Sequence, residues 1–247
     1  MEKEKKIAVL IDADNVAPKY VKGMMDEIAK FGSLTIKRIY GDFTQQNKNG
    51  WKNVLLENAI IPIQQFSYTT GKNSTDSAMI IDAMDILHSD EIDGFCLVSS
   101  DSDFTRLAMR LRESGKLVVG MGAKITPKPF ISACNVFIYL EVLRGAEGAQ
   151  KAQQSNNTMS HDSLPARVGA KTINLLNQSI DDVADENGWA PLGEVGQLVL
   201  KKKPDFDPRN YGFKKLSLLI EACPSHFDVS KRNGNKQSVH VYVKRKV

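Results

Sequence analysis

Two short apolar runs, each of which ends in carboxylates, most strongly constrain what this chain can fold into. Residues 7–11 lead directly into Asp12, and residues 94–98 lead through two serines into Asp101 and Asp103. A helical pattern follows each run, and such runs are typical of buried strands in a parallel sheet. The carboxyl ends of parallel strands form the ligand crevice of the sheet, so acids from distant parts of the chain should meet there.

Strand-like and helix-like segments alternate through residue 143. The expected strands span residues 7–11, 34–40, 60–66, 94–99, 116–121 and 136–140. The expected helices span residues 19–31, 48–58, 75–88, 104–113 and 129–133. Strands that are separated by helices imply right-handed crossovers, so the fold class predicted for this part is an α/β parallel-sheet sandwich.

Composition and cysteine usage are those of a globular cytoplasmic protein. The 247 residues are 42% hydrophobic and 25% charged, and no apolar run approaches the ~20 residues that span a bilayer. The charged N-terminus leads directly into a strand and lacks the apolar core of a secretory signal. Cys96, Cys134 and Cys223 lack metal-ligand spacing, so we interpret them as thiols in a reducing compartment. These features predict no membrane partner.

The positive charge of the chain is concentrated in its C-terminal part. Residues 1–143 contain 17 Lys and Arg against 18 Asp and Glu, whereas residues 144–247 contain 16 against 11. Residues 145–162 are rich in Gly, Ala, Gln, Asn and Ser, a composition typical of a flexible linker. We therefore expect one domain at residues 1–144 and a second, basic domain at residues 163–247, which suits a polyanionic partner.

The C-terminal part has the pattern of three helices followed by a β-hairpin. The expected helices span residues 164–186, 191–203 and 209–222. Residues 227–229 and 238–243 alternate as strands around Asn233-Gly234, which is a hairpin signal. Three helices and a hairpin describe a small winged-helix domain.

The candidate site is a set of carboxylates without the partners that nucleophilic catalysis requires. Asp12 and Asp101 follow strands, and Asp76 lies in the first turn of a predicted helix, where the helix dipole alone also favours an acid. Carboxylates that face one another favour a divalent cation between them, and oxygen ligands suit Mg²⁺ or Mn²⁺. The neighbouring residues that either support this site or cap helices are Asp14, Asn15 and Asp103.

At these acids the chain resembles the NYN domain family, relatives of PIN-domain ribonucleases. The motifs that carry the resemblance are residues 9–15, 72–76 and 98–104, in the family's order. The resemblance spans residues 5–143. It implies a PIN-like, Rossmann-like fold with metal-dependent cleavage of RNA. We expect the substrate to be single-stranded RNA and the enzyme to be an endonuclease.

The family pattern also implies roles for individual residues. Asp12, Asp76 and Asp101 would be the catalytic acids that bind Mg²⁺ or Mn²⁺. Ser100 stands where the family usually has a glycine before the third acid. On this pattern Asn15 and Asp103 would support the site, and we expect Asp14 and Ser100, which lie beside the acids in the sequence, to support it as well.

The C-terminal part resembles a LOTUS (OST-HTH) domain at residues 188–196, 206–212 and 216–220. The resemblance implies an RNA-binding winged helix, and some eukaryotic members also bind helicases, so a protein partner is expected beside RNA. The alternative is a wing that serves dimerisation. The basic residues expected to contact RNA phosphates are Lys201, Lys202, Lys203, Lys214 and Lys215 on the helices, and Lys231, Arg232 and Lys236 at the wing.

Two other functions fit the same residues. Asp12 and Asp14 satisfy the D-x-D-x-[TV] pattern of haloacid-dehalogenase phosphatases, in which Asp12 would be a covalent nucleophile and Asp14 a general acid. Lys72, Asp101 and Asp103 would then supply the remaining groups, but no cap insertion is evident and an RNA-binding tail has no role. The third hypothesis is a non-catalytic RNA-binding or adaptor protein with a PIN-like shell.

Overall fold

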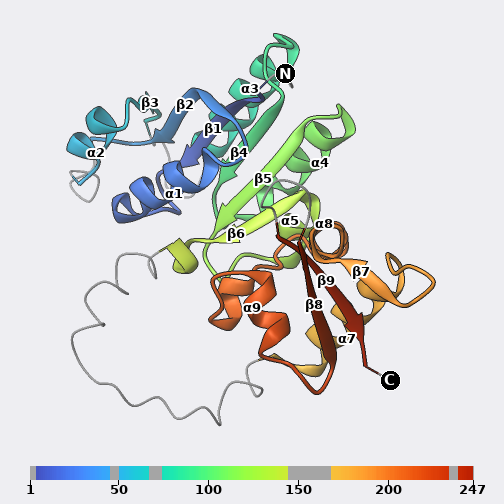
Figure 1. Cartoon of the computed structure of the whole chain (residues 1–247). Helices are drawn as coiled ribbons and strands as arrows, with labels where there is room; N and C mark the ends of the chain where they lie inside the picture. The colour runs from blue at the N-terminus through green and yellow to red at the C-terminus, as the bar shows by residue number, and fades with distance from the viewer. Residues whose placement is uncertain (1–3, 45–49, 67–73, 144–167, 234–238, 247) are drawn as a thin grey trace, which may run out of the picture. The chain divides into compact units, whose positions relative to one another are not determined.

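The computed structural model of the chain describes residues 4–44, 50–66, 74–143, 168–233 and 239–246 (Figure 1). The chain divides into two compact units, residues 1–151 and residues 152–247. The predicted linker at residues 145–162 lies outside the described residues, and the predicted domain limits stay predictions. Among the described residues, no helix is both long enough and apolar enough to cross a membrane.

The first unit is built on a six-stranded parallel sheet with the strand order β3-β2-β1-β4-β5-β6. Its strands are β1 (Lys6–Asp12), β2 (Ser33–Gly41), β3 (Ile61–Gln64), β4 (Gly94–Val98), β5 (Leu117–Gly122) and β6 (Val136–Tyr139). Its helices are η1 (Pro18–Tyr20), α1 (Val21–Ile28), α2 (Trp51–Glu57), α3 (Ser74–His88), η3 (Ser102–Phe104), α4 (Thr105–Glu113) and α5 (Lys128–Ala133).

Apolar side chains alternate along β1 and divide the core of this unit into two. Ala8 and Leu10 pack with residues of α3, α4 and α5 on one face of the sheet. Val9 and Ile11 pack with residues of α1 and α2 on the other face. Helices therefore cover both faces, which explains why the strands read as continuous apolar runs. The predicted α/β parallel-sheet sandwich is confirmed.

The strand order reverses between β1 and β4. From β1 the chain builds outward through β2 and β3, then returns to β4 on the other side of β1 and continues through β5 and β6. In sheets of this kind the carboxyl ends of the two strands at the reversal form the ligand crevice. Asp12 is the last residue of β1, and Asp101 follows the end of β4. The topology thus places both acids at the crevice.

The second unit combines helices with a three-stranded antiparallel sheet of order β7-β9-β8. Ile173, Leu176 and Ile180 of the first helix share an apolar core with Val195 and Val243. This arrangement agrees with the predicted winged helix. Its elements are α7 (Ala170–Asp181), β7 (Trp189–Pro191), α8 (Leu192–Lys202), η6 (Pro208–Tyr211), α9 (Leu216–Glu221), β8 (Phe227–Asn233) and β9 (Val239–Arg245).

Two helix predictions in this unit were wrong in extent. The helix expected at residues 209–222 is broken into η6 and α9, because Gly212 adopts a left-handed conformation with φ of 89°. The helix expected to reach residue 186 ends at Asp181. The Asp185 carboxylate instead accepts from the backbone N–H groups of Asn187 and Trp189, which turns the chain into β7. The predicted hairpin turn at Gly234 lies outside the described residues.

We predict that Gly212→Ala destabilises the protein by about 1 kcal/mol, because a left-handed φ strains any residue with a Cβ atom. Gly193→Ala is the matched control, since Gly193 lies in helix α8 with open space where a Cβ atom would lie. Alanine favours helix there, so this variant should be neutral or slightly more stable. Thermal unfolding of both full-length variants measures the difference, and equal transition temperatures would contradict the expectation.

Candidate functional site

Asp12 ends strand β1, and three hydrogen bonds hold its carboxylate. Its Oδ1 accepts from the backbone N–H of Asp14 at 2.9 Å. Its Oδ2 accepts from Asn15 Nδ2 at 2.6 Å and from Ser99 Oγ at 2.8 Å. Asp12 is only 1% exposed. A carboxylate this buried requires donors in place of water, so the loop after β1 folds back over the acid that ends it.

Ser99 links the carboxyl ends of strands β1 and β4. Its hydroxyl donates to Asp12 and accepts from the backbone N–H of Asp101 at 3.1 Å. Its own backbone N–H donates to the carbonyl of Met121 in β5 at 2.9 Å. The residue is fully buried. One serine therefore fixes the positions of two of the predicted acids relative to each other.

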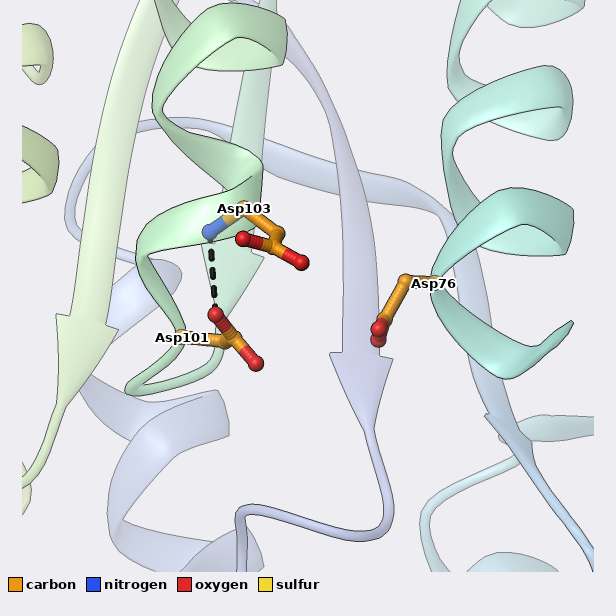
Figure 2. A group of neighbouring side chains, drawn as sticks. All are labelled: Asp76, Asp101 and Asp103. Atoms are coloured by element: carbon orange, nitrogen blue, oxygen red, sulfur yellow. Dashed lines mark hydrogen bonds between the residues drawn. The ribbon is translucent and has the colours of Figure 1, made fainter. Parts of the chain in front are cut away.

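Asp76, Asp101 and Asp103 form a group of carboxylates near the carboxyl ends of β1 and β4. Asp101 and Asp103 lie between β4 and α4, where Asp101 Oδ1 accepts from the backbone N–H of Asp103 at 2.9 Å and caps η3. Asp76 lies in the first turn of α3 and points toward them (Figure 2). One carboxylate oxygen of each residue lies within 4.8 Å of the other two.

The charges of this group change the acidity of Asp76. Burial is the largest cause that raises the pKa of Asp76 to about 6, and the neighbouring carboxylates contribute after it, in the order Asp12, Asp101, Asp103 and Asp14. Like charges at such short range disfavour ionisation unless a cation compensates them. The group is therefore an anionic site in which neighbouring negative charge favours the protonated form of Asp76.

The structure brings together most of the residues that the sequence indicates. The group within 4.8 Å contains Asp103, which was expected to support the site, and does not contain Asp12, which was expected to bind metal. Asp12 is near enough to act on the pKa of Asp76, but hydrogen bonds engage both of its oxygens. The assignment of metal ligands stays a prediction.

The remaining supporting residues have definite contacts. Asn15 and the backbone of Asp14 donate to Asp12, and Asp14 itself is exposed. Ser100 Oγ accepts from the backbone N–H of Ala123 at 2.9 Å, which joins the loops after β4 and β5. Sequence reasoning missed Ser99. The signal was its place directly after a buried strand, where a polar side chain needs a buried partner.

The environment of Asp12 is unfavourable for the phosphatase hypothesis. A covalent nucleophile needs an oxygen that can reach the substrate, whereas Asp12 is 1% exposed and accepts three hydrogen bonds. The lysine that this hypothesis requires, Lys72, lies outside the described residues.

The basic candidates of the second unit differ in how they are paired. Lys202 Nζ lies 2.6 Å from Asp182, and Lys231 Nζ lies 2.8 Å from Glu221. Lys203 Nζ donates to Tyr211. Lys214 and Lys215 were predicted on a helix, but they lie in the bend before α9, because the break at Gly212 delays the start of that helix. Lys201 lies on α8, and Lys236 lies outside the described residues.

Comparison with known families agrees with this architecture. A family model described as NYN domain matches residues 6–141, and a second model described as OST-HTH/LOTUS domain matches residues 165–239. A curated relative is an uncharacterized protein of Methanocaldococcus jannaschii, which is 30% identical over 125 residues, 49% of each chain. The chain therefore spans about half the length of the curated relative that it matches.

Two solved structures are similar to parts of the chain. A protein of unknown function from Vibrio parahaemolyticus is 19% identical with a TM-score of 0.48, over 56% of this chain and 94% of that one. A solution structure of an uncharacterized protein from Nitrosomonas europaea is 30% identical with a TM-score of 0.31, over 38% of this chain and 91% of that one.

We predict that Asp76 makes stability fall as pH rises when divalent cations are absent. The folded state raises the pKa of Asp76 from 3.8 to about 6, so it holds the proton more tightly than the unfolded state does. The free energy of unfolding should therefore decrease as the pH rises from about 4 to above 6. Asp76→Asn removes the cost of ionising this carboxyl group in the folded state. The variant's free energy of unfolding at pH 7 should be higher by on the order of 1 kcal/mol, a value discounted for solvent screening of a partly exposed group.

Denaturant unfolding at pH 4 and pH 7 in EDTA measures this effect. Asp85→Asn is the control, because it makes the same change on an exposed part of the same helix. The expectation fails if wild type and Asp76→Asn lose the same amount of stability between the two pH values.

Proposed function

Because the chain belongs to the NYN domain family and also contains an OST-HTH/LOTUS domain, we propose that it is a metal-dependent ribonuclease. The proposed substrate is single-stranded RNA, and the proposed cleavage is endonucleolytic. The second unit would recruit the RNA to the first. The proposed cation is Mg²⁺ or Mn²⁺.

The observation that supports catalysis best is the carboxylate group at the strand-order reversal. Asp76 comes from a helix and Asp101 and Asp103 from a loop after β4, yet their oxygens lie within 4.8 Å of one another. An arrangement of like charges is costly for folding. A protein that had no use for a cation would gain stability by replacing one of these acids.

The residues present fit a divalent cation. The donor set consists of carboxylate oxygens, which hard cations such as Mg²⁺ and Mn²⁺ prefer. The raised pKa of Asp76 reflects burial and negative charge that the protein's own donors leave uncompensated. Asp76, Asp101 and Asp103 would hold the cation, and Asp12 would add its charge from behind them. When bound, such a cation neutralises charge on a scissile phosphate and makes water more acidic.

The protein's own groups would position the substrate and the acids. The hydrogen bonds of Asp12 with Ser99 and Asn15 hold its carboxylate in a fixed position. The cap that Asp101 makes on Asp103 sets the separation of these two acids. Asp103 is exposed at the mouth of the site, so RNA phosphates would approach from its side.

We expect Asp101→Asn to lower RNA cleavage by more than roughly 100-fold, since it removes a ligand charge at the site. The amide oxygen of asparagine can still cap η3, so the fold should survive. Cleavage of an unstructured RNA in the presence of Mg²⁺ or Mn²⁺ measures the loss. Asp90→Asn is the matched control, because Asp90 is an exposed acid whose positive φ of 52° also suits asparagine.

Wild-type protein that never cuts RNA with either cation would contradict the catalytic proposal. The non-catalytic RNA-binding hypothesis would then remain. Equal losses in Asp101→Asn and Asp90→Asn would point instead to a general effect of removing a carboxylate.

The proposed role of the second unit rests on its family match and its charge. Residues 152–247 contain 14 Lys and Arg against 10 Asp and Glu. Lysines attract the RNA backbone by releasing condensed counterions, without reading sequence. The proposed phosphate contacts are Lys201, Lys202, Lys203, Lys214, Lys215, Lys231, Arg232 and Lys236.

We predict that RNA binding by the full chain weakens linearly in a log–log titration with KCl. Lys201→Gln should reduce the steepness by ~0.7, the value for one phosphate contact on a single strand. Lys30→Gln is the control, because Lys30 follows α1 just before β2 begins, at the sheet edge opposite the acids. Fluorescence anisotropy in EDTA measures both slopes. An affinity that KCl does not change would contradict the phosphate-contact assignment.

A further inference from the structure

The three-stranded sheet of the second unit has an apolar inner face and a polar outer face. Ala190, Val229 and Val243 belong to, or pack against, the apolar core. Side chains alternate along a strand, so the residues beside them point to the opposite face. The outer-facing residues with planar side chains include Trp189 of β7, Tyr242 of β9 and Arg232 of β8.

These three side chains lie together as one surface, which we call the planar face (Trp189, Tyr242 and Arg232). The Arg232 guanidinium lies 4.2 Å from the centre of the Tyr242 ring and 5.8 Å from the centre of the Trp189 ring. The strand register explains the grouping, since Trp189 pairs with Lys244 and Arg232 pairs with His240, on either side of Tyr242 along β9.

The planar face is accessible and lies on strands with a net positive charge. Trp189 and Tyr242 are partly exposed, and Arg232 is exposed. On the outer-facing positions of β8 and β9, two basic residues, Arg232 and Lys244, lie beside one acid, Asp228. Within the part of the chain that the structure describes, Arg232 forms no ion pair. The Arg232 charge is therefore available to a ligand that binds at the planar face.

We propose that the planar face binds unpaired nucleobases of single-stranded RNA by stacking. This proposal rests on the proposed RNA-binding role of the second unit and names the residues that would contact the bases. Aromatic rings and the guanidinium plane stack on bases of any sequence, and neighbouring cations attract the phosphates. An apolar protein partner would not explain the positive charge of Arg232. Phosphate contacts alone would not require the Trp189 and Tyr242 rings beside its guanidinium.

The first experiment measures the affinity of the full chain in EDTA for an unstructured RNA and for the same RNA annealed to its complement. Tyr242→Leu and Trp189→Leu should each weaken binding of the unpaired RNA about 5- to 150-fold, the usual range for one stacked base. Binding of the duplex should change little, because its bases are already stacked. Leu218→Ala, which shortens an apolar side chain that is 44% exposed on α9, controls for loss of surface.

Two conservative variants separate stacking from charge and from folding. Tyr242→Phe keeps the ring and should keep the affinity. Arg232→Lys keeps the charge and loses the plane, so it should lose affinity for unpaired RNA. If Arg232→Lys binds as wild type does, the guanidinium acts through charge alone and the stacking proposal is overturned.

The second experiment needs no change in the planar face. The chain has two tryptophans, and Trp51 is buried in the first unit. In a Trp51→Phe variant, fluorescence reports on Trp189 alone, and stacking of a base should quench it in a saturable way. Salt-sensitive RNA binding without this quench would overturn the stacking proposal and leave the RNA-binding role intact. A chain that binds no RNA would overturn both.

Discussion

The hydrogen bond from Ser99 to Asp12 is the interaction on which the candidate site depends. Strands β1 and β4 are distant in sequence but adjacent where the strand order reverses, and Ile11 pairs with Val98 in their register. The next residues on the two strands, Asp12 and Ser99, therefore meet at the carboxyl edge. Because Ser99 also accepts from the backbone of Asp101, the spacing of the acids is set by the sheet register.

Much of this arrangement could be predicted from the sequence, because it follows from strand ends. Apolar runs that alternate with helical patterns indicate a parallel sheet, and acids after two of these runs must share one edge. The place of Asp103 beside Asp76 could not be predicted in this way. In a D-x-D turn either acid can cap the helix, and only the geometry of η3 shows that Asp101 caps and still offers an oxygen.

In the second unit, some features depend on strand pairing and could not be predicted from the local sequence pattern. Strand β7 has three residues and contains Pro191, so its sequence gives no strand signal, and it forms because β9 provides a partner. The sequence reveals the charge of Arg232, which predicts a phosphate contact. It does not reveal that Tyr242 lies 4.2 Å from the guanidinium, because that proximity depends on the register of two strands.

The two units differ in charge and therefore in how strongly each would attract a polyanion. The crevice of the first unit is buried and negative enough to raise the pKa of Asp76 to about 6, so it repels phosphate unless a cation is present. The unit as a whole adds no compensating attraction, since residues 1–151 contain 19 basic and 19 acidic residues. On the proposed function, long-range attraction of RNA would therefore come from the basic residues of the second unit. If the acidic group binds a cation and acts on RNA as proposed, a basic domain on the same chain would raise the local concentration of that substrate.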